Sequence, residues 1–158
     1  MAEDDQSSPE RPTRLVLQKL PVQFWWASLG LYALALTQDG FYIGGNNPRA
    51  WSPGWGELIA GWVSVMEGTS AWLANPLLFI GWITYRSSNR SVPLMCASAA
   101  FILAVSFLGV KRVVVSEAPT FAQVTGYGAG YWFWVLSALS LLVANLARLW
   151  GARFRPSL

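Results

Sequence analysis

The sequence predicts an all-α integral membrane protein: a four-helix bundle with both termini in the cytoplasm. Apolar residues are grouped into runs of membrane length; residues 92–110 carry no charge, and three other stretches are nearly as apolar. A hydrocarbon core about 30 Å thick needs roughly 20 apolar residues of helix to cross it. Charged residues make up 12% of the 158-residue chain, about half the share typical of a soluble domain. Both observations indicate that lipid is the solvent of this fold.

The expected boundaries follow from these runs. Residues 1–14 are polar and contain prolines, which predicts a disordered cytoplasmic tail. Residues 15–150 form the membrane domain, and residues 151–158 form a short basic cytoplasmic tail. The predicted spans cover residues of about 22–43, 61–84, 92–110 and 128–149.

The stretch at residues 55–85 has two interpretations. It is too long for one untilted crossing and too short for two crossings and a turn. We expect a single helix over residues 61–84, kinked at Pro76, because proline removes one backbone hydrogen bond. The alternative is two half-helices with a break near residues 68–70.

The connections are less regular. Residues 44–56 are dense in Gly, Asn and Pro and predict turns. Residues 113–115 either extend the third helix or form a short strand. Residues 116–127 are expected to be a polar loop.

Basic residues set the orientation. Arg49, Lys111 and Arg112 fall on one side of the four-span arrangement, and every other Lys and Arg falls on the opposite side. Because cytoplasmic loops carry the excess of Lys and Arg, the richer side, which holds both termini, is cytoplasmic. The 10 Trp residues fit the aromatic belts found where a membrane meets water.

A candidate polar stripe lies in the second predicted span. Ser64, Glu67 and Asn75 recur at helical spacing and would share one face of a continuous helix. A carboxylate at the centre of a span costs roughly 2.5–3.5 kcal/mol on insertion scales, so Glu67 should be neutral, paired or wet. Three roles remain open: a binding cavity or proton path, a helix-packing face, or an interfacial position for Glu67.

A second candidate cluster comprises Asp39, Arg49 and Glu57, around the first outer loop. An acid–Arg pair there would order the loop over the mouth of the bundle, and such a loop could bind a partner or ligand. Alternatively, Glu57 follows Pro53 and Gly54 as a first-turn acid that complements a helix dipole.

Composition argues against several activities. The chain has no His, which removes histidine-based haem, zinc and general-base chemistry. Its one cysteine, Cys96, lies in an apolar run without a CxxC motif. We therefore expect no cofactor, no metal and no catalytic residue. The basic residues flank the spans, so orientation explains them better than nucleic-acid binding does.

Two short motifs carry a resemblance: AWLANPLL at residues 71–78 and GYGAGYWFW at residues 126–134. With them, the chain resembles a set of small, uncharacterised bacterial four-span inner-membrane proteins. The resemblance implies a bacterial inner-membrane setting and no particular activity.

For function, the sequence favours a multi-pass inner-membrane protein acting as a non-enzymatic accessory or partner protein of a membrane complex. The alternative is a small carrier, channel or ligand-binding protein that uses the Glu/Asn stripe. A third hypothesis is an intramembrane enzyme, or enzyme subunit, for a lipid-like substrate. The expected partners are the lipid bilayer, a membrane protein and a small apolar ligand.

Overall fold

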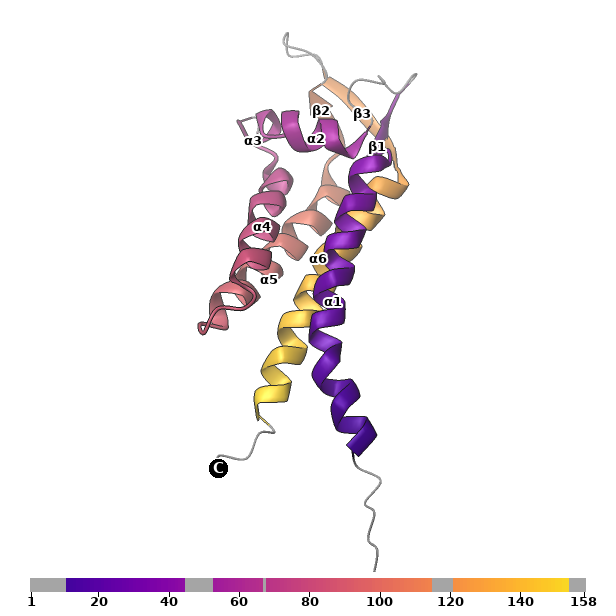
Figure 1. The fold of residues 1–158 in the computed structure, drawn as a ribbon. Coiled ribbons are helices and arrows are strands. Elements are labelled where there is room, and N and C mark those ends of the chain that lie inside the picture. The colour runs from indigo at the N-terminus through magenta and orange to yellow at the C-terminus, as the bar shows by residue number, and fades with distance from the viewer. Residues whose placement is uncertain (1–10, 45–52, 67, 115–120, 154–158) are drawn as a thin grey trace, which may run out of the picture.

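The computed structural model describes residues 11–44, 53–66, 68–114 and 121–153. Its long helices run side by side and form the body of the molecule (Figure 1). These helices are α1 (Arg11–Thr37), α4 (Ala74–Thr84), α5 (Ser91–Ser106) and α6 (Ala129–Arg153). The start of α1 and the end of α6 lie at the same end of the body. Both helices reach into the segments predicted as tails, and the remaining tail residues lie outside the described part.

Small residues form the centre of the helix packing. Ala97, Ala100 and Ala104 of α5 are fully buried, as are Ala138 and Leu141 of α6. Small side chains allow helix backbones to approach closely, which is how helices associate in lipid. The core therefore combines close contact between helices at these alanines with large buried side chains such as Leu78, Trp82 and Leu141.

The outer faces of these helices are apolar. Ile83 is 81% exposed, Met95 69% and Ile102 65%, and large exposed apolar surfaces mark contact with a membrane or a partner. Within the described segments, two helices are long and apolar enough to cross a membrane: Ser91–Gly109 and Ala129–Gly151.

A hydrogen-bonded group of buried side chains joins three helices. The Ser28 hydroxyl of α1 donates to the Ser137 carbonyl oxygen of α6 at 2.8 Å, and the Ser137 hydroxyl donates to the Ser28 carbonyl oxygen at 2.8 Å. The Trp82 Nε1–H of α4 donates to the Ser28 hydroxyl oxygen at 2.9 Å. These bonds fix the relative positions of the three helices.

The prediction of one continuous helix over residues 61–84 is wrong, and the alternative of a broken helix describes the chain better. The segment contains α2 (Gly54–Ala60), α3 (Val63–Met66), the 3₁₀ helix η1 (Ser70–Leu73) and then α4. Gly68 has a φ of 91°, which a right-handed helix does not allow. Pro76 lies in the first turn of α4, a location where its missing N–H is tolerated.

The prediction of an all-α fold is also incomplete, because the mostly helical chain carries a three-stranded sheet. Its order is β1 (Phe41–Ile43), β3 (Phe121–Tyr127), β2 (Arg112–Val114), and β3 pairs antiparallel with both neighbours. The first predicted span thus ends at Thr37, and a strand follows it. The polar loop expected at residues 116–127 contains β3, whereas the short strand considered near residue 113 is present. The sheet, α2 and α3 together cover one end of the helices and are here called the cap (Figure 1).

Glycines join the cap to the helices. The Gly54 N–H donates to the Gln38 carbonyl oxygen at 2.9 Å, and the Gly130 N–H donates to the Asp39 carbonyl oxygen at 2.8 Å. A Cβ atom on Gly128 would overlap with that same Asp39 carbonyl. This close backbone approach requires glycine and holds α1, the sheet and the start of α6 together.

Candidate functional site

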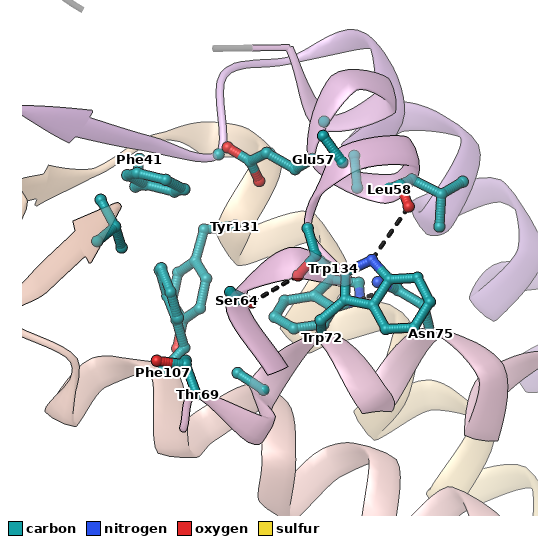
Figure 2. A pocket seen from close by; sticks show the side chains of 18 of the residues that line it. Phe41, Glu57, Leu58, Ser64, Thr69, Trp72, Asn75, Phe107, Tyr131 and Trp134 are labelled. Atoms are coloured by element: carbon teal, nitrogen blue, oxygen red, sulfur yellow. Dashed lines mark hydrogen bonds between the residues drawn. The ribbon is translucent and has the colours of Figure 1, made fainter. Parts of the chain in front are cut away.

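A cavity of about 420 Å³ lies between the cap and the ends of the long helices. Residues of α1, β1, α2, α3, η1, α4, η2 (Phe107–Gly109), β2 and α6 contribute to its walls. Figure 2 shows the side chains that surround it. The lining is mainly aromatic and aliphatic, with a few polar groups placed among apolar ones.

Glu57 is the acidic residue of this lining. It lies in the first turn of α2, as one of the two interpretations of the sequence predicted. A Cβ atom on Gly40 would overlap with both carboxylate oxygens, so glycine makes room for this side chain. The Glu57 Oε1 atom is buried and has no hydrogen-bond partner in the structure.

The surroundings of Glu57 favour its protonated form. Burial, and secondarily the negative charge of Asp39, raise the pKa of the Glu57 carboxyl from 4.5 to about 8. Burial acts because a carboxylate loses its hydration, and Asp39 acts because like charges repel. At neutral pH the cavity therefore contains mainly an uncharged carboxyl group.

Asn75 is held in one orientation in the cavity wall. Its Oδ1 atom accepts hydrogen bonds from the Tyr32 hydroxyl at 3.1 Å and the Trp134 Nε1–H at 2.9 Å. Because both neighbours donate, the amide oxygen must face them and the NH₂ group carries the donors away from them. Side chains of α1, α4 and α6 thus meet at one buried amide.

The aromatic side chains around the cavity use their polar atoms on the protein. The Tyr131 hydroxyl donates to the Ala104 carbonyl oxygen at 3.1 Å, and the Trp72 Nε1–H donates to the Leu58 carbonyl oxygen at 3.0 Å. Phe107 packs against Tyr131 with ring centroids 5.8 Å apart. A ligand in the cavity would therefore contact mainly the apolar surface of these rings.

The structure joins two groups of residues that the sequence analysis treated separately. Ser64 and Asn75 of the polar stripe and Glu57 of the outer-loop cluster all line the same cavity. Asp39 lies beside it and acts on the charge of Glu57. The other two predicted residues, Glu67 and Arg49, lie outside the described residues.

Sequence reasoning missed Tyr32 and Trp134, the partners of Asn75. Trp134 was assigned to an aromatic belt, which explains a Trp near a span end without any specific partner. Within the described segments, no group of three or more His, Cys, Asp or Glu side chains could hold a metal ion. The arrangement is suited to holding a small molecule through the Glu57 carboxyl, the hydroxyl groups of Ser64 and Thr69 and several ring faces.

Comparison with models of known protein families, with curated proteins and with solved structures finds no match to this chain. The resemblance to small bacterial four-span proteins stays a prediction.

Proposed function

We propose that this protein is a multi-pass protein of the bacterial inner membrane that binds a small, largely apolar ligand in the cavity beneath the cap. In this proposal α1, η1 with α4, α5 with η2, and α6 are the four spans. The cap lies on the outer side, and α2 with Glu57 lies outside the spans.

Several features support the membrane part of this proposal. Two of the four helices have the length and apolar composition of spans, and the run Ser70–Thr84 is apolar but shorter. The start of α1, the end of α6 and the loop between α4 and α5 all lie on the side of the body away from the cap (Figure 1). That loop contains Arg86 and Arg90, so the rule that cytoplasmic loops are basic orients this side toward the cytoplasm.

The observation that carries the ligand-binding function is the unpartnered Glu57 carboxyl oxygen beside a cavity of about 420 Å³. Small-molecule sites typically measure about 300–1,000 Å³ and combine apolar walls with a few placed polar groups. A buried polar atom without a partner costs about 1–3 kcal/mol. A ligand that interacts with this oxygen of Glu57 would recover this energy, so binding of such a ligand would be favoured.

Filling the cavity tests this function. Ser64 points into it (Figure 2), so Ser64→Phe should occupy the ligand volume. Val65, the next residue of α3, is not part of the lining, and Val65→Phe is the matched control. The native protein and both variants are purified in mild detergent and measured by native mass spectrometry.

We expect the native protein and Val65→Phe to retain a bound small molecule or lipid that Ser64→Phe has lost. Equal retention by all three proteins would contradict binding in this cavity. The same purification tests the other prediction from the sequence, an accessory or partner role, because a protein partner would co-purify at a fixed stoichiometry.

A further inference from the structure

The chemistry of the cavity restricts the class of ligand. Apart from tyrosines, Glu57 is the one titratable side chain that lines the cavity in the described segments. The hydroxyls of Tyr32 and Tyr131 donate to Asn75 and to the Ala104 carbonyl, and phenols stay neutral near pH 7 because their ordinary pKa is about 10. Among the residues that the structure describes, the only charge that an occupant can meet directly is thus the negative charge of an ionised Glu57.

The nearby groups add to this negative character. Asp39, between α1 and β1, raises the pKa of Glu57 through its own negative charge. Lys111 and Arg112, beside and on β2, are exposed and do not line the cavity. On the remaining packed elements, α3 and η1, the lining side chains are uncharged. In the described residues, therefore, no basic side chain within the cavity competes for Glu57.

The aromatic walls favour the same class of ligand. Phe41, Phe107, Tyr131 and Trp134 surround the space beside Glu57 (Figure 2). The face of an aromatic ring carries partial negative charge and attracts a cation within about 6 Å of its centre. A carboxylate together with several ring faces is the arrangement that recognises organic ammonium groups.

We propose that the cavity binds an apolar organic cation, an amine or quaternary ammonium, whose positive charge pairs with the Glu57 carboxylate and displaces the Glu57 proton. This inference rests on the proposed ligand-binding function and names its ligand class. The exchange is balanced: Glu57–COOH and the free cation become the Glu57–COO⁻·cation pair and one proton released to solvent. A neutral ligand would release no proton.

Proton exchange fixes the pH dependence of binding. Below the pKa of Glu57, about 8, each cation must displace a proton, so affinity should fall by about tenfold for each unit that the pH decreases. Above that pKa the carboxyl is already ionised, and affinity should level off.

A matched pair of ligands tests the inference. Benzyltrimethylammonium carries a permanent charge, and neopentylbenzene has the same shape without one. Binding of each molecule to the full-length protein in detergent is measured by titration calorimetry at a pH below the pKa of Glu57. The measurement is made in two buffers of different ionisation enthalpy, because the difference between the two binding enthalpies gives the number of protons released. The series is repeated across pH, and with Glu57→Gln, which resembles the protonated side chain in shape.

We expect the native protein to bind the cation with release of about one proton. Glu57→Gln should bind the cation roughly 10- to 100-fold more weakly, because the charge–charge attraction to the carboxylate is lost, and should show no pH dependence. Neopentylbenzene should bind both proteins alike, which shows that the variant is folded. Proton release by the native protein tests the exchange independently of any variant.

Two results would overturn the inference alone. They are binding of neopentylbenzene at least as tight as that of the cation, and cation binding without proton release; in both cases the cavity would still bind ligands. Failure of both molecules to bind, together with equal ligand retention by Ser64→Phe and the native protein, would overturn the inference and the proposed function together.

Discussion

Replacing Glu57 by glutamine should change how the stability of the protein depends on pH. The folded state favours the protonated carboxyl, because the pKa of Glu57 is about 8 when folded and 4.5 when free in water. A raised pKa of this kind contributes stability that is fully present below 4.5 and is lost as the pH rises through 8. Glutamine keeps the shape of the protonated side chain and has no proton to lose, so Glu57→Gln should abolish this loss.

The size of the effect follows from the difference between the two pKa values. One pKa unit corresponds to about 1.4 kcal/mol, so the full difference gives an upper bound of roughly 5 kcal/mol. Part of the Glu57 side chain reaches solvent, and water and relaxation around a carboxylate reduce such penalties, so we expect about 2–4 kcal/mol. For a chain of this size, that corresponds to a difference in melting temperature of roughly 5–15 °C.

The assay is thermal unfolding in detergent, followed by tryptophan fluorescence, from about pH 5 to about pH 9. The melting temperature of the native protein should fall across this range relative to that of Glu57→Gln, and the two should converge at the acidic end. Asp39→Asn is the comparison variant: it removes the second cause of the raised pKa, so the transition should remain but move to lower pH. Parallel curves for the native protein and Glu57→Gln would refute a buried, protonated Glu57.

Two further substitutions test the packing of the helices and the break between them. Ser28→Ala removes the acceptor of the buried Trp82 Nε1–H and should lower the free energy of unfolding by roughly 1–2 kcal/mol. The control Ser106→Ala removes an exposed hydrogen bond within one helix and should change that free energy by no more than about 0.5 kcal/mol. Unfolding in SDS measures both variants, and equal losses of stability would contradict the role of Ser28. In Gly68→Ala the new Cβ atom meets no atom within 4 Å but lies on a residue with a φ of 91°, so the variant should lose about 1 kcal/mol of stability. In the control Gly109→Ala the Cβ atom also has no neighbour within 4 Å, and the residue has no positive φ. This control should therefore lose less stability in the same assay. A loss from Gly109→Ala as large as that from Gly68→Ala would refute strain at Gly68.

Among the described residues, the two helices that are long and apolar enough to cross a membrane could be predicted from composition alone. The predicted spans at residues 92–110 and 128–149 nearly coincide with Ser91–Gly109 and Ala129–Gly151. A run of apolar residues is a local property of the sequence, and its length is set by the thickness of the bilayer rather than by contacts with other segments.

The sheet and the broken helix depend on contacts that are distant in the sequence. β3 pairs with Phe41–Ile43 on one side and with Arg112–Val114 on the other, and strand preference reflects such partners more than the residues themselves. Burial alternates along β3, but polarity in its sequence does not follow this alternation, because Phe121 is exposed on the same side as Gln123 and Thr125. Gly68 indicated a break as one alternative, but its positive φ was not readable from the sequence.

The candidate site was partly predictable for a related reason. Ser64 and Asn75 were selected because they are polar residues in an apolar stretch, and this signal holds although they lie on different elements. Glu57 was selected as an acid near a helix start, but its burial depends on Gly40, which approaches it from another segment. The pKa of Glu57 is therefore a property of the fold and not of the local sequence.

The break at Gly68 and the cavity have a common structural origin. Because the helical run of η1 and α4 begins only at Ser70, after the break at Gly68, the chain before it crosses over the ends of the long helices as α2 and α3 (Figure 1). This crossing leaves the cavity between the cap and the helices, and it places Glu57 of α2 on the side of the cavity that the cap forms. In the proposed arrangement the carboxyl then lies outside the spans, where burial is only partial. Such a location raises the pKa to about 8 and keeps ionisation accessible near neutral pH, which a carboxyl at the centre of a span would not allow.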